Sequence, residues 1–168
     1  MKTFRWLGVL FLVAALAGCG DIYGVKTDHD KNADFNSLKK FNWLAVPAEV
    51  KLDADIQAML KKAVDTELQT KGFMKTEDSP DFLIGMHTGS QTQTVYKSSA
   101  WSMYGVGQIV AVPYEEGTLV LDFLSTKSRQ AVWRGSAKAQ LQPEMTPAQK
   151  EKIINEAVKK ILKKFPPK

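Results

Sequence analysis

The clearest periodic pattern lies near the C-terminal end of the chain. Apolar residues recur there at helical spacing, at Ile153, Ile154, Ala157, Val158, Ile161, Leu162 and Phe165. Thr146-Pro147-Ala148-Gln149 matches a capping box with proline at the first helical position, and Pro166 and Pro167 end the pattern. Lysines fall opposite the apolar stripe. The pattern therefore predicts an amphipathic helix with one buried face and one solvated face.

A second amphipathic helix is predicted from about Asp53 to Lys71. Its inward positions are Ile56, Leu60, Ala63, Val64 and Leu68. Gly72 is placed for a left-handed C-terminal cap. Glu67 projects near the middle of the apolar stripe, which leaves two interpretations. It is either a buried carboxylate with a raised pKa, of the kind that functional sites exploit, or a long side chain that reaches water or pairs with Lys71.

The remaining regular segments favour β-structure. Strands are predicted at 41–46, 81–88, 117–124 and 130–137, with a further edge strand at 22–27. The third and fourth flank a turn at 125–129 and form a hairpin. Alternation places Leu119, Leu121 and Phe123 on one face, and Asp122 on the other as a second candidate for a buried polar group. We expect an α+β domain in which an antiparallel sheet of about four to six strands packs against two amphipathic helices.

The segment from Gly89 to Glu116 is the least regular, rich in small polar residues and interrupted by aromatic ones. In one interpretation it extends two strands into a protruding hairpin, with Trp101, Met103 and Tyr104 near the tip. Aromatic and methionine side chains on such a loop are typical of partner-binding sites. In the other interpretation it is a loop whose aromatic side chains pack on the domain's own core.

The N-terminus has the pattern of a processing signal. Lys2 and Arg5 precede an uncharged run from Trp6 to Gly18, which is too short for the roughly 20 apolar residues of a membrane-spanning helix. The run ends in Leu16-Ala17-Gly18-Cys19, which resembles the bacterial lipobox. We expect cleavage before Cys19 and attachment of lipid, including palmitate, to its thiol, because the thiolate is the nucleophile that forms the thioether. Gly20, in place of aspartate, favours the outer membrane, with the protein facing the periplasm.

Length and charge refine this organisation. The 168 residues are 44% hydrophobic, and we expect a cleaved signal peptide at 1–18, a tether or edge strand at 19–34 and one α+β domain at 35–168. Lys+Arg number 23 against 18 Asp+Glu, and seven of the lysines lie between Lys150 and Lys168. These lysines either contact anionic lipid headgroups or form a solvated face that complements the helix dipole.

Most catalytic chemistry lacks a signal in this sequence. There are two histidines, His29 and His87, and Cys19 is the single cysteine, so we expect neither a disulfide within the chain nor a metal site. No nucleophile-elbow or dinucleotide-binding motif is present, and we expect no cofactor and no enzymatic activity. A serine nucleophile paired with His87 and either Asp81 or Asp122 is the alternative. Export excludes nucleic acid as a partner.

Several blocks of the mature chain resemble the bacterial lipoproteins grouped as domain-of-unknown-function family 4136. They are Asp34-Phe35, Phe41-Asn42-Trp43-Leu44, Glu67 to Phe73, Pro80 to Ile84, Gly117 to Asp122 and Val132-Trp133-Arg134-Gly135. The resemblance implies an α+β domain, an envelope location and no established activity. Ser125 stands where the family often has a second acidic residue, which argues against a cation-binding pair with Asp122. Trp133 fits a core anchor, with Gly135 at a close approach.

These observations lead to one leading hypothesis and two alternatives. The leading hypothesis is a lipid-anchored envelope protein that acts as a non-catalytic binding or assembly-accessory module for another envelope component. The first alternative is a tethered hydrolase of an envelope polymer or lipid. The second is a structural protein at the membrane surface that uses its basic C-terminal helix.

Overall fold

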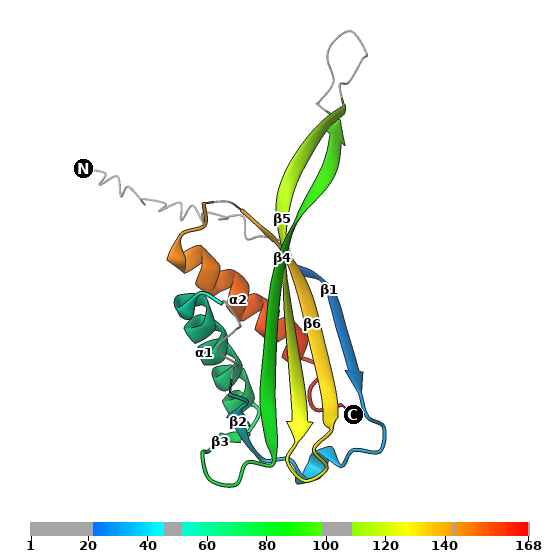
Figure 1. Cartoon of the computed structure of the whole chain (residues 1–168), viewed down its shortest axis with the longest axis vertical. Coiled ribbons are helices and arrows are strands. Elements are labelled where there is room, and N and C mark those ends of the chain that lie inside the picture. The colour runs from blue at the N-terminus through cyan, green and yellow to red at the C-terminus, as the bar shows by residue number, and fades with distance from the viewer. Residues whose placement is uncertain (1–21, 46–51, 99–108, 143, 168) are drawn as a thin grey trace, which may run out of the picture.

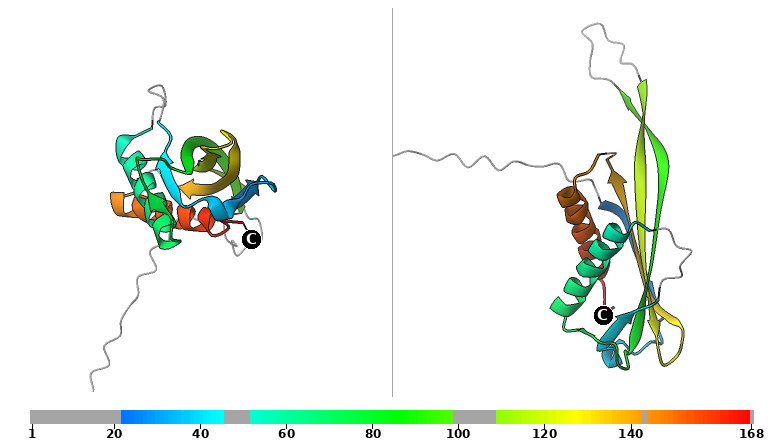
Figure 2. Two further views of the ribbon diagram at one scale, coloured as in Figure 1. Left: turned by 90° about the horizontal axis from the view of Figure 1, so that it is seen from below. Right: turned by 60° about the vertical axis from the view of Figure 1, so that its left-hand side comes forward.

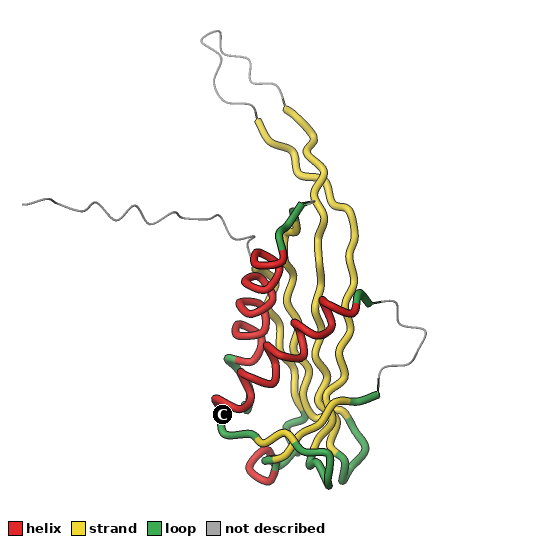
Figure 3. The backbone as a smooth tube through the Cα atoms, turned by 90° about the vertical axis from the view of Figure 1, so that its left-hand side faces the viewer, coloured by secondary structure: helices red, strands yellow, loops and turns green. Residues whose placement is uncertain are grey.

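The chain folds into two layers, a sheet and a pair of helices (Figure 1). The computed structural model describes residues 22–45, 52–98, 109–142 and 144–167. The elements in chain order are β1 (Ile22–His29), a short 3-10 helix (Phe35–Ser37), β2 (Lys40–Trp43), α1 (Ala54–Thr70), β3 (Met74–Lys75), β4 (Phe82–Ser98), β5 (Ile109–Ser125), β6 (Ala131–Leu141) and α2 (Pro147–Leu162). Both helices cover the same face of the sheet, as Figure 2 and Figure 3 show. We call this the helix face and the opposite one the open face.

Both predicted helices are confirmed, and each begins at a side-chain cap. The Asp53 carboxylate accepts hydrogen bonds from the backbone N–H groups of Asp55 and Ile56 at the start of α1. At the start of α2, Thr146 and Gln149 form the reciprocal capping box that their spacing predicts. Gly72 follows α1 with a φ of +87°, a conformation that a side chain disfavours.

The sheet has six strands in the order β1-β6-β5-β4-β2-β3. The α+β class and the expected number of strands are therefore confirmed, and the expectation of an antiparallel sheet is confirmed for four of the six strands. β1, β6, β5 and β4 pair antiparallel, whereas β2 is parallel to both β3 and β4. The reason is that α1 crosses over between β2 and the next strands and returns the chain to the end of the sheet at which it started.

Two of the strands are much longer than the others. β4 and β5 pair continuously from Phe82 opposite Ser125 to Ser98 opposite Ile109. β6 accompanies β5 only as far as Glu115, which lies opposite Leu141. Beyond that point β4 and β5 continue as a two-stranded ribbon that projects past the rest of the sheet (Figure 1). The sequence left this segment open between a hairpin and a loop, and its strand-forming part is a hairpin.

The core between the two layers is centred on aromatic rings. Phe165, just beyond α2, is 1% exposed. Its ring centroid lies 4.6 Å from that of Phe123, 5.2 Å from that of Trp133 and 5.2 Å from that of Phe73. Aromatic pairs at such separations are favourable beyond the area that they bury. These contacts fix the C-terminal end of α2 to the middle of the sheet.

Gly135 gives this core its closest approach. A Cβ atom at this position would collide with the Trp133 ring and with Cγ2 of Ile161, 2.5 Å away. Trp133 is 2% exposed and Arg134 next to it is exposed, which confirms the predicted roles of Trp133 and Gly135. The absence of a side chain at Gly135 therefore lets α2 lie directly on β6.

We expect Gly135→Ala to lower the free energy of unfolding by about 1–3 kcal/mol, because neither the ring nor the helix can move away without disturbing the core. Urea denaturation followed by circular dichroism measures the change. Gly89→Ala is the matched control, because a Cβ there would meet no atom within 4 Å. Its effect should stay within about 0.5 kcal/mol. Equal stability of both variants would contradict the packing described for Gly135.

Candidate functional site

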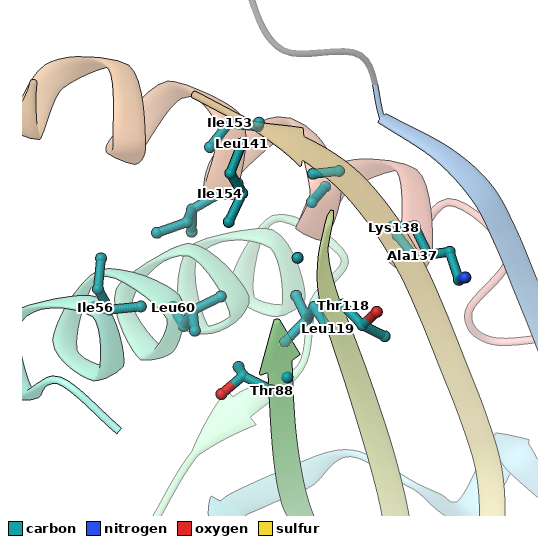
Figure 4. Close-up of a pocket in the computed structure, with 14 residues that line it drawn as sticks. Ile56, Leu60, Thr88, Thr118, Leu119, Ala137, Lys138, Leu141, Ile153 and Ile154 are labelled. Atoms are coloured by element: carbon teal, nitrogen blue, oxygen red, sulfur yellow. The ribbon is translucent and has the colours of Figure 1, made fainter. Parts of the chain in front are cut away.

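The two layers leave an apolar cavity of about 150 Å³ between them (Figure 4). Its walls come from both helices and from the three central strands. They include Ile56 and Leu60 of α1, Ile153, Ile154 and Ala157 of α2, and Gly117, Leu119, Ala137, Ala139 and Leu141 of the sheet. The cavity is open at the surface, and ligand pockets are lined mostly by apolar side chains of this kind. The cavity is thus suited to an apolar part of a ligand.

Small residues create this space. Gly89, Gly117, Ala137 and Ala139 line its sheet side, where larger side chains would fill the gap. A Cβ at Gly117 would lie 2.8 Å from Cδ1 of Leu141, so the glycine also allows Leu141 to turn across the strand. A strand interior gains nothing from glycine through its backbone preference. Close packing and the open volume together account for glycine at this position.

A wider depression of about 520 Å³ adjoins the cavity near the base of the ribbon. It shares Ile56, Leu141, Ile153 and Ile154 with the cavity, and Asp53, Glu115 and Lys150 also line it. We call the cavity and this depression together the interlayer groove. Its inner part is apolar and its outer part carries charge, the arrangement typical of sites that bind a ligand in one orientation.

Asp122 lies on the open face, where it is 6% exposed. Its Oδ2 accepts a hydrogen bond of 3.0 Å from Nη2 of Arg134, and its Oδ1 accepts one from Nε of the same guanidinium. Nε2 of His87 lies 3.5 Å from Oδ2. The Asp122 carboxylate, through these hydrogen bonds and its charge, raises the pKa of Arg134. The bidentate pair holds Arg134 across the sheet. The register of β4 with β5 places His87 near Asp122, one of its two predicted partners.

Glu116 is a second buried carboxylate on the open face, 4% exposed. Oε1 accepts hydrogen bonds from Nζ of Lys138 at 2.8 Å and from Nε2 of Gln91 at 3.2 Å, and Oε2 accepts one from the Tyr23 hydroxyl at 2.6 Å. The bonds from Lys138 and then Tyr23 lower the pKa of Glu116, against the effect of burial. The hydrogen bond that the Tyr23 hydroxyl donates to Glu116 raises the pKa of this hydroxyl well above its usual range. We call these residues the Glu116 cluster. It joins four strands where the ribbon leaves the sheet.

The residues named from the sequence fall into three groups. Cys19, Trp101, Met103 and Tyr104 lie outside the described residues. The side chain of Glu67 is 26% exposed, and its Oε1 lies 4.0 Å from Nζ of Lys71, in agreement with the pairing interpretation. Asp122 is buried and paired, as described above. Neither Glu67 nor Asp122 lines the interlayer groove.

Sequence reasoning missed the Glu116 cluster and the groove. Glu116 shares its face with Asp122 by simple alternation, so a carboxylate on the same side of the strand was visible in the pattern. Its partners Tyr23 and Lys138 come from distant strands, and only the pairing register reveals them. Within the described ranges, no three His, Cys, Asp or Glu side chains gather in a way that would hold a metal ion. The described helices include none long and apolar enough to cross a membrane.

Comparison with known families identifies the domain. The family described as "Domain of unknown function (DUF4136)" matches residues 25–167. The chain belongs to this family. The match begins within β1 and ends after the aromatic core, so it covers all the described residues of this DUF4136 domain except 22–24. No curated protein matches the sequence.

One solved structure shares the fold of this DUF4136 domain at low identity, and two others give weaker matches. A PDZ domain protein from Parabacteroides distasonis matches with a TM-score of 0.61 and 12% identity over 89% of this chain and 37% of that one, so the chain spans little more than a third of that protein. A PelC dodecamer from Paraburkholderia phytofirmans gives a TM-score of 0.46 at 9% identity, covering 82% and 93% of the two chains. A neuraminyllactose-binding hemagglutinin homolog from Helicobacter pylori gives 0.42 at 16%, covering 77% and 80%. The first similarity shows a shared fold alone.

The lowered pKa of Glu116 predicts a stability effect that depends on pH. Its contribution is present above the unfolded-state pKa of about 4.3 and is lost as the pH falls through the lower folded-state value. Glu116→Gln should therefore unfold at lower urea concentration than the wild type at pH 7, and this difference should shrink at pH 3.

Glu115→Gln is the matched control, because it removes a neighbouring carboxylate that is exposed. Its urea midpoint should follow that of the wild type at both pH values. A Glu116→Gln variant whose deficit is as large at pH 3 as at pH 7 would rule out the ionised carboxylate as the cause.

Proposed function

We propose that this DUF4136 domain is a non-catalytic binding module, held on the bacterial cell envelope by a lipid on Cys19. The observation that carries the proposal is the interlayer groove, an apolar space open at the surface beside the protruding ribbon. Its polar neighbours include no arrangement that activates a nucleophile among the described residues. Such a groove is suited to binding apolar groups.

The open-face carboxylates also support binding rather than hydrolysis. His87 and Asp122 are the two members of the hydrolytic alternative that lie together. Both oxygens of Asp122 accept hydrogen bonds from Arg134, which makes the carboxylate part of a cross-strand ion pair. In a catalytic triad, by contrast, the carboxylate points at the histidine ring and accepts a hydrogen bond from it. The 3.5 Å separation and the exposed histidine fit a surface pair better.

The position of β1 links the anchor to the groove. β1 begins at Ile22, opposite Ala139, and Ala139 lines the cavity. Cys19 is three residues earlier in the chain, a distance of at most about 11 Å. A lipid on Cys19 would hold this end of the sheet, with the groove opening and the base of the ribbon, close to a bilayer. The sequence pattern after the cysteine favours the outer membrane, and the domain would then face the periplasm and a partner in the envelope.

The anchor can be tested by metabolic labelling. We expect wild-type protein to incorporate radioactive palmitate and to fractionate with the outer membrane. Cys19→Ala should remain uncleaved and unlabelled, because no other thiol exists in the chain. Cys19→Ser, which keeps nearly the same side-chain size but lacks the thiol, should also be unlabelled. Normal labelling of either variant would exclude Cys19 as the site of lipidation.

The binding role can be tested by cross-linking in living cells followed by mass spectrometry. The test variant replaces residues 94–113 by Asn-Gly, which joins Gln93 to its partner Tyr114 through a two-residue turn. This shortens the ribbon and removes Trp101, Met103 and Tyr104, but it keeps the Glu116 cluster. We expect one reproducible envelope partner with the wild type, captured at least about tenfold less with the short-ribbon variant.

Lys127→Gln, with the full ribbon, serves as the control and should capture the partner normally, because Lys127 is exposed in the turn after β5 and does not line the groove. If the folded and correctly localised wild type captures no partner, the binding role is wrong. Capture that is equal in all variants would place the contact away from the ribbon.

A further inference from the structure

The described residues leave the outer edge of β4 unpaired over most of its length. β2 accompanies β4 only from Phe82 to Ile84, where the backbone N–H of Leu44 donates to the carbonyl of Ile84. Beyond Ile84 no described residue pairs with this edge. The register determines which backbone groups face outward, because both groups of a strand residue point to the same side. Ile84 faces β2, and so the residues that follow it on the same side are Met86, Thr88, Ser90, Thr92 and Thr94.

Other described edges of the sheet are protected against pairing. β1 has an irregular register between Tyr23 and Lys26, with Gly24 at a φ of +59°. β3 has two residues. The edge of β5 along the ribbon contains Pro113. Bulges, short strands and proline are the devices by which proteins blunt sheet edges.

The β4 edge from Met86 to Thr94 has none of these devices. It pairs with β5 without a bulge and contains no proline, lysine, arginine or carboxylate. An uncharged and regular edge of about 27 Å, with no strand from the described part of the chain beside it, is a template for another strand. Proteins that keep such an edge commonly use it to bind an extended peptide.

The interlayer groove runs beside this edge. Thr88 and Ser90 of β4 line it together with Leu52 and Ile56, which lie at the start of α1. A strand added to β4 would direct every second side chain toward the helix face, and therefore toward Ile56 and the apolar interior of the groove. The remaining side chains would lie beside His87 and Gln91 on the open face. Backbone pairing and a row of apolar contacts would be available to the same ligand.

We propose that β4 binds an extended peptide segment of a partner protein by strand addition, along Met86 to Thr94 and with alternate apolar side chains in the interlayer groove. This deepens the proposed function, on which it rests for the existence of a partner. The ligand is a peptide rather than a lipid, because only a backbone supplies donors and acceptors at the two-residue spacing of the edge. Asp53 and Glu115 outnumber Lys150 at the groove rim, so a basic residue flanking the segment is favoured over an acidic one.

The first experiment selects a ligand and then removes single outward N–H groups. The probe is a phage-displayed library of ten-residue peptides with valine, isoleucine, leucine or phenylalanine at alternate positions, screened against the full chain in detergent. The strongest binder is synthesised with a fluorescent label. Thr88→Pro and Ser90→Pro each remove an outward N–H while leaving the bonds to β5 intact, a substitution that edge strands tolerate. We expect each to weaken peptide binding by roughly tenfold or more.

Thr88→Val and Ser90→Ala are the matched controls, since they change the side chain and keep the N–H. We expect them to weaken binding by less than about threefold. Equal affinity of the proline variants and the wild type would overturn strand addition. So would equal losses in the proline variants and their controls, because the side chain would then be the group recognised. Failure of the library to yield any binder would also overturn the proposal.

Hydrogen exchange on the wild type tests the same contact without any substitution, should a proline variant fail to fold. In the free protein, the amides of Met86, Thr88, Ser90 and Thr92 should exchange fast, and those of Gly85, His87 and Gly89, which face β5, should exchange slowly. Addition of the peptide should protect the first set. Protection of that set without peptide would mean that the chain covers its own edge, and would overturn the proposal.

The cross-linking experiment, repeated with the Thr88 variants, distinguishes failure of strand addition from failure of the proposed binding role. A cellular partner that cross-links normally to Thr88→Pro would keep the binding role and reject strand addition as its mechanism. Loss of that partner in Thr88→Pro, but not in Thr88→Val, would support both.

Discussion

The packing of Phe165 against the sheet is the interaction on which the architecture depends. Its ring meets those of Phe123 and Trp133 from two central strands and that of Phe73 from the segment after α1, so one side chain joins elements from three parts of the chain. Gly135 allows α2, which ends just before Phe165, to approach β6 closely. Nearer the start of α2, small residues on the sheet leave the interlayer groove between the helix and the strands. A firm contact at one end and an open space at the other are parts of one arrangement.

The sequence predicted the parts of the fold that are encoded locally. Apolar periodicity and caps gave both helices, and alternation gave the central strands, because these signals depend on neighbours within a few residues. The direction of β2 was not evident from its own residues, since strand direction follows from the crossover through α1. The same limit applied to the ribbon. Its polar residues carry no apolar alternation, and pairing between β4 and β5 rather than burial holds it extended.

The candidate site was harder to predict because it is assembled from distant segments. Asp122 interrupts an apolar pattern, which makes it a candidate for burial. Glu116 follows another acidic residue, and its sequence neighbours do not indicate that it is buried. Tyr23 and Lys138, which bind Glu116, meet it only through the register of β1, β6 and β5. No sequence motif marks the position of the groove. It results from glycine and alanine on strands and from the angle between two layers, neither of which a linear pattern records.

The place of Phe165 in the chain has a consequence for how the protein is made. Synthesis proceeds from the N-terminus, so β4, β5 and β6 are complete before the residue that closes the aromatic core emerges. During that interval the apolar helix face of the sheet and the bare edge of β4 are both uncovered, which is the condition under which chains associate with one another. We therefore expect the nascent chain to depend on holding chaperones until α2 arrives, and β-strand pairing to be native only after the last helix has docked.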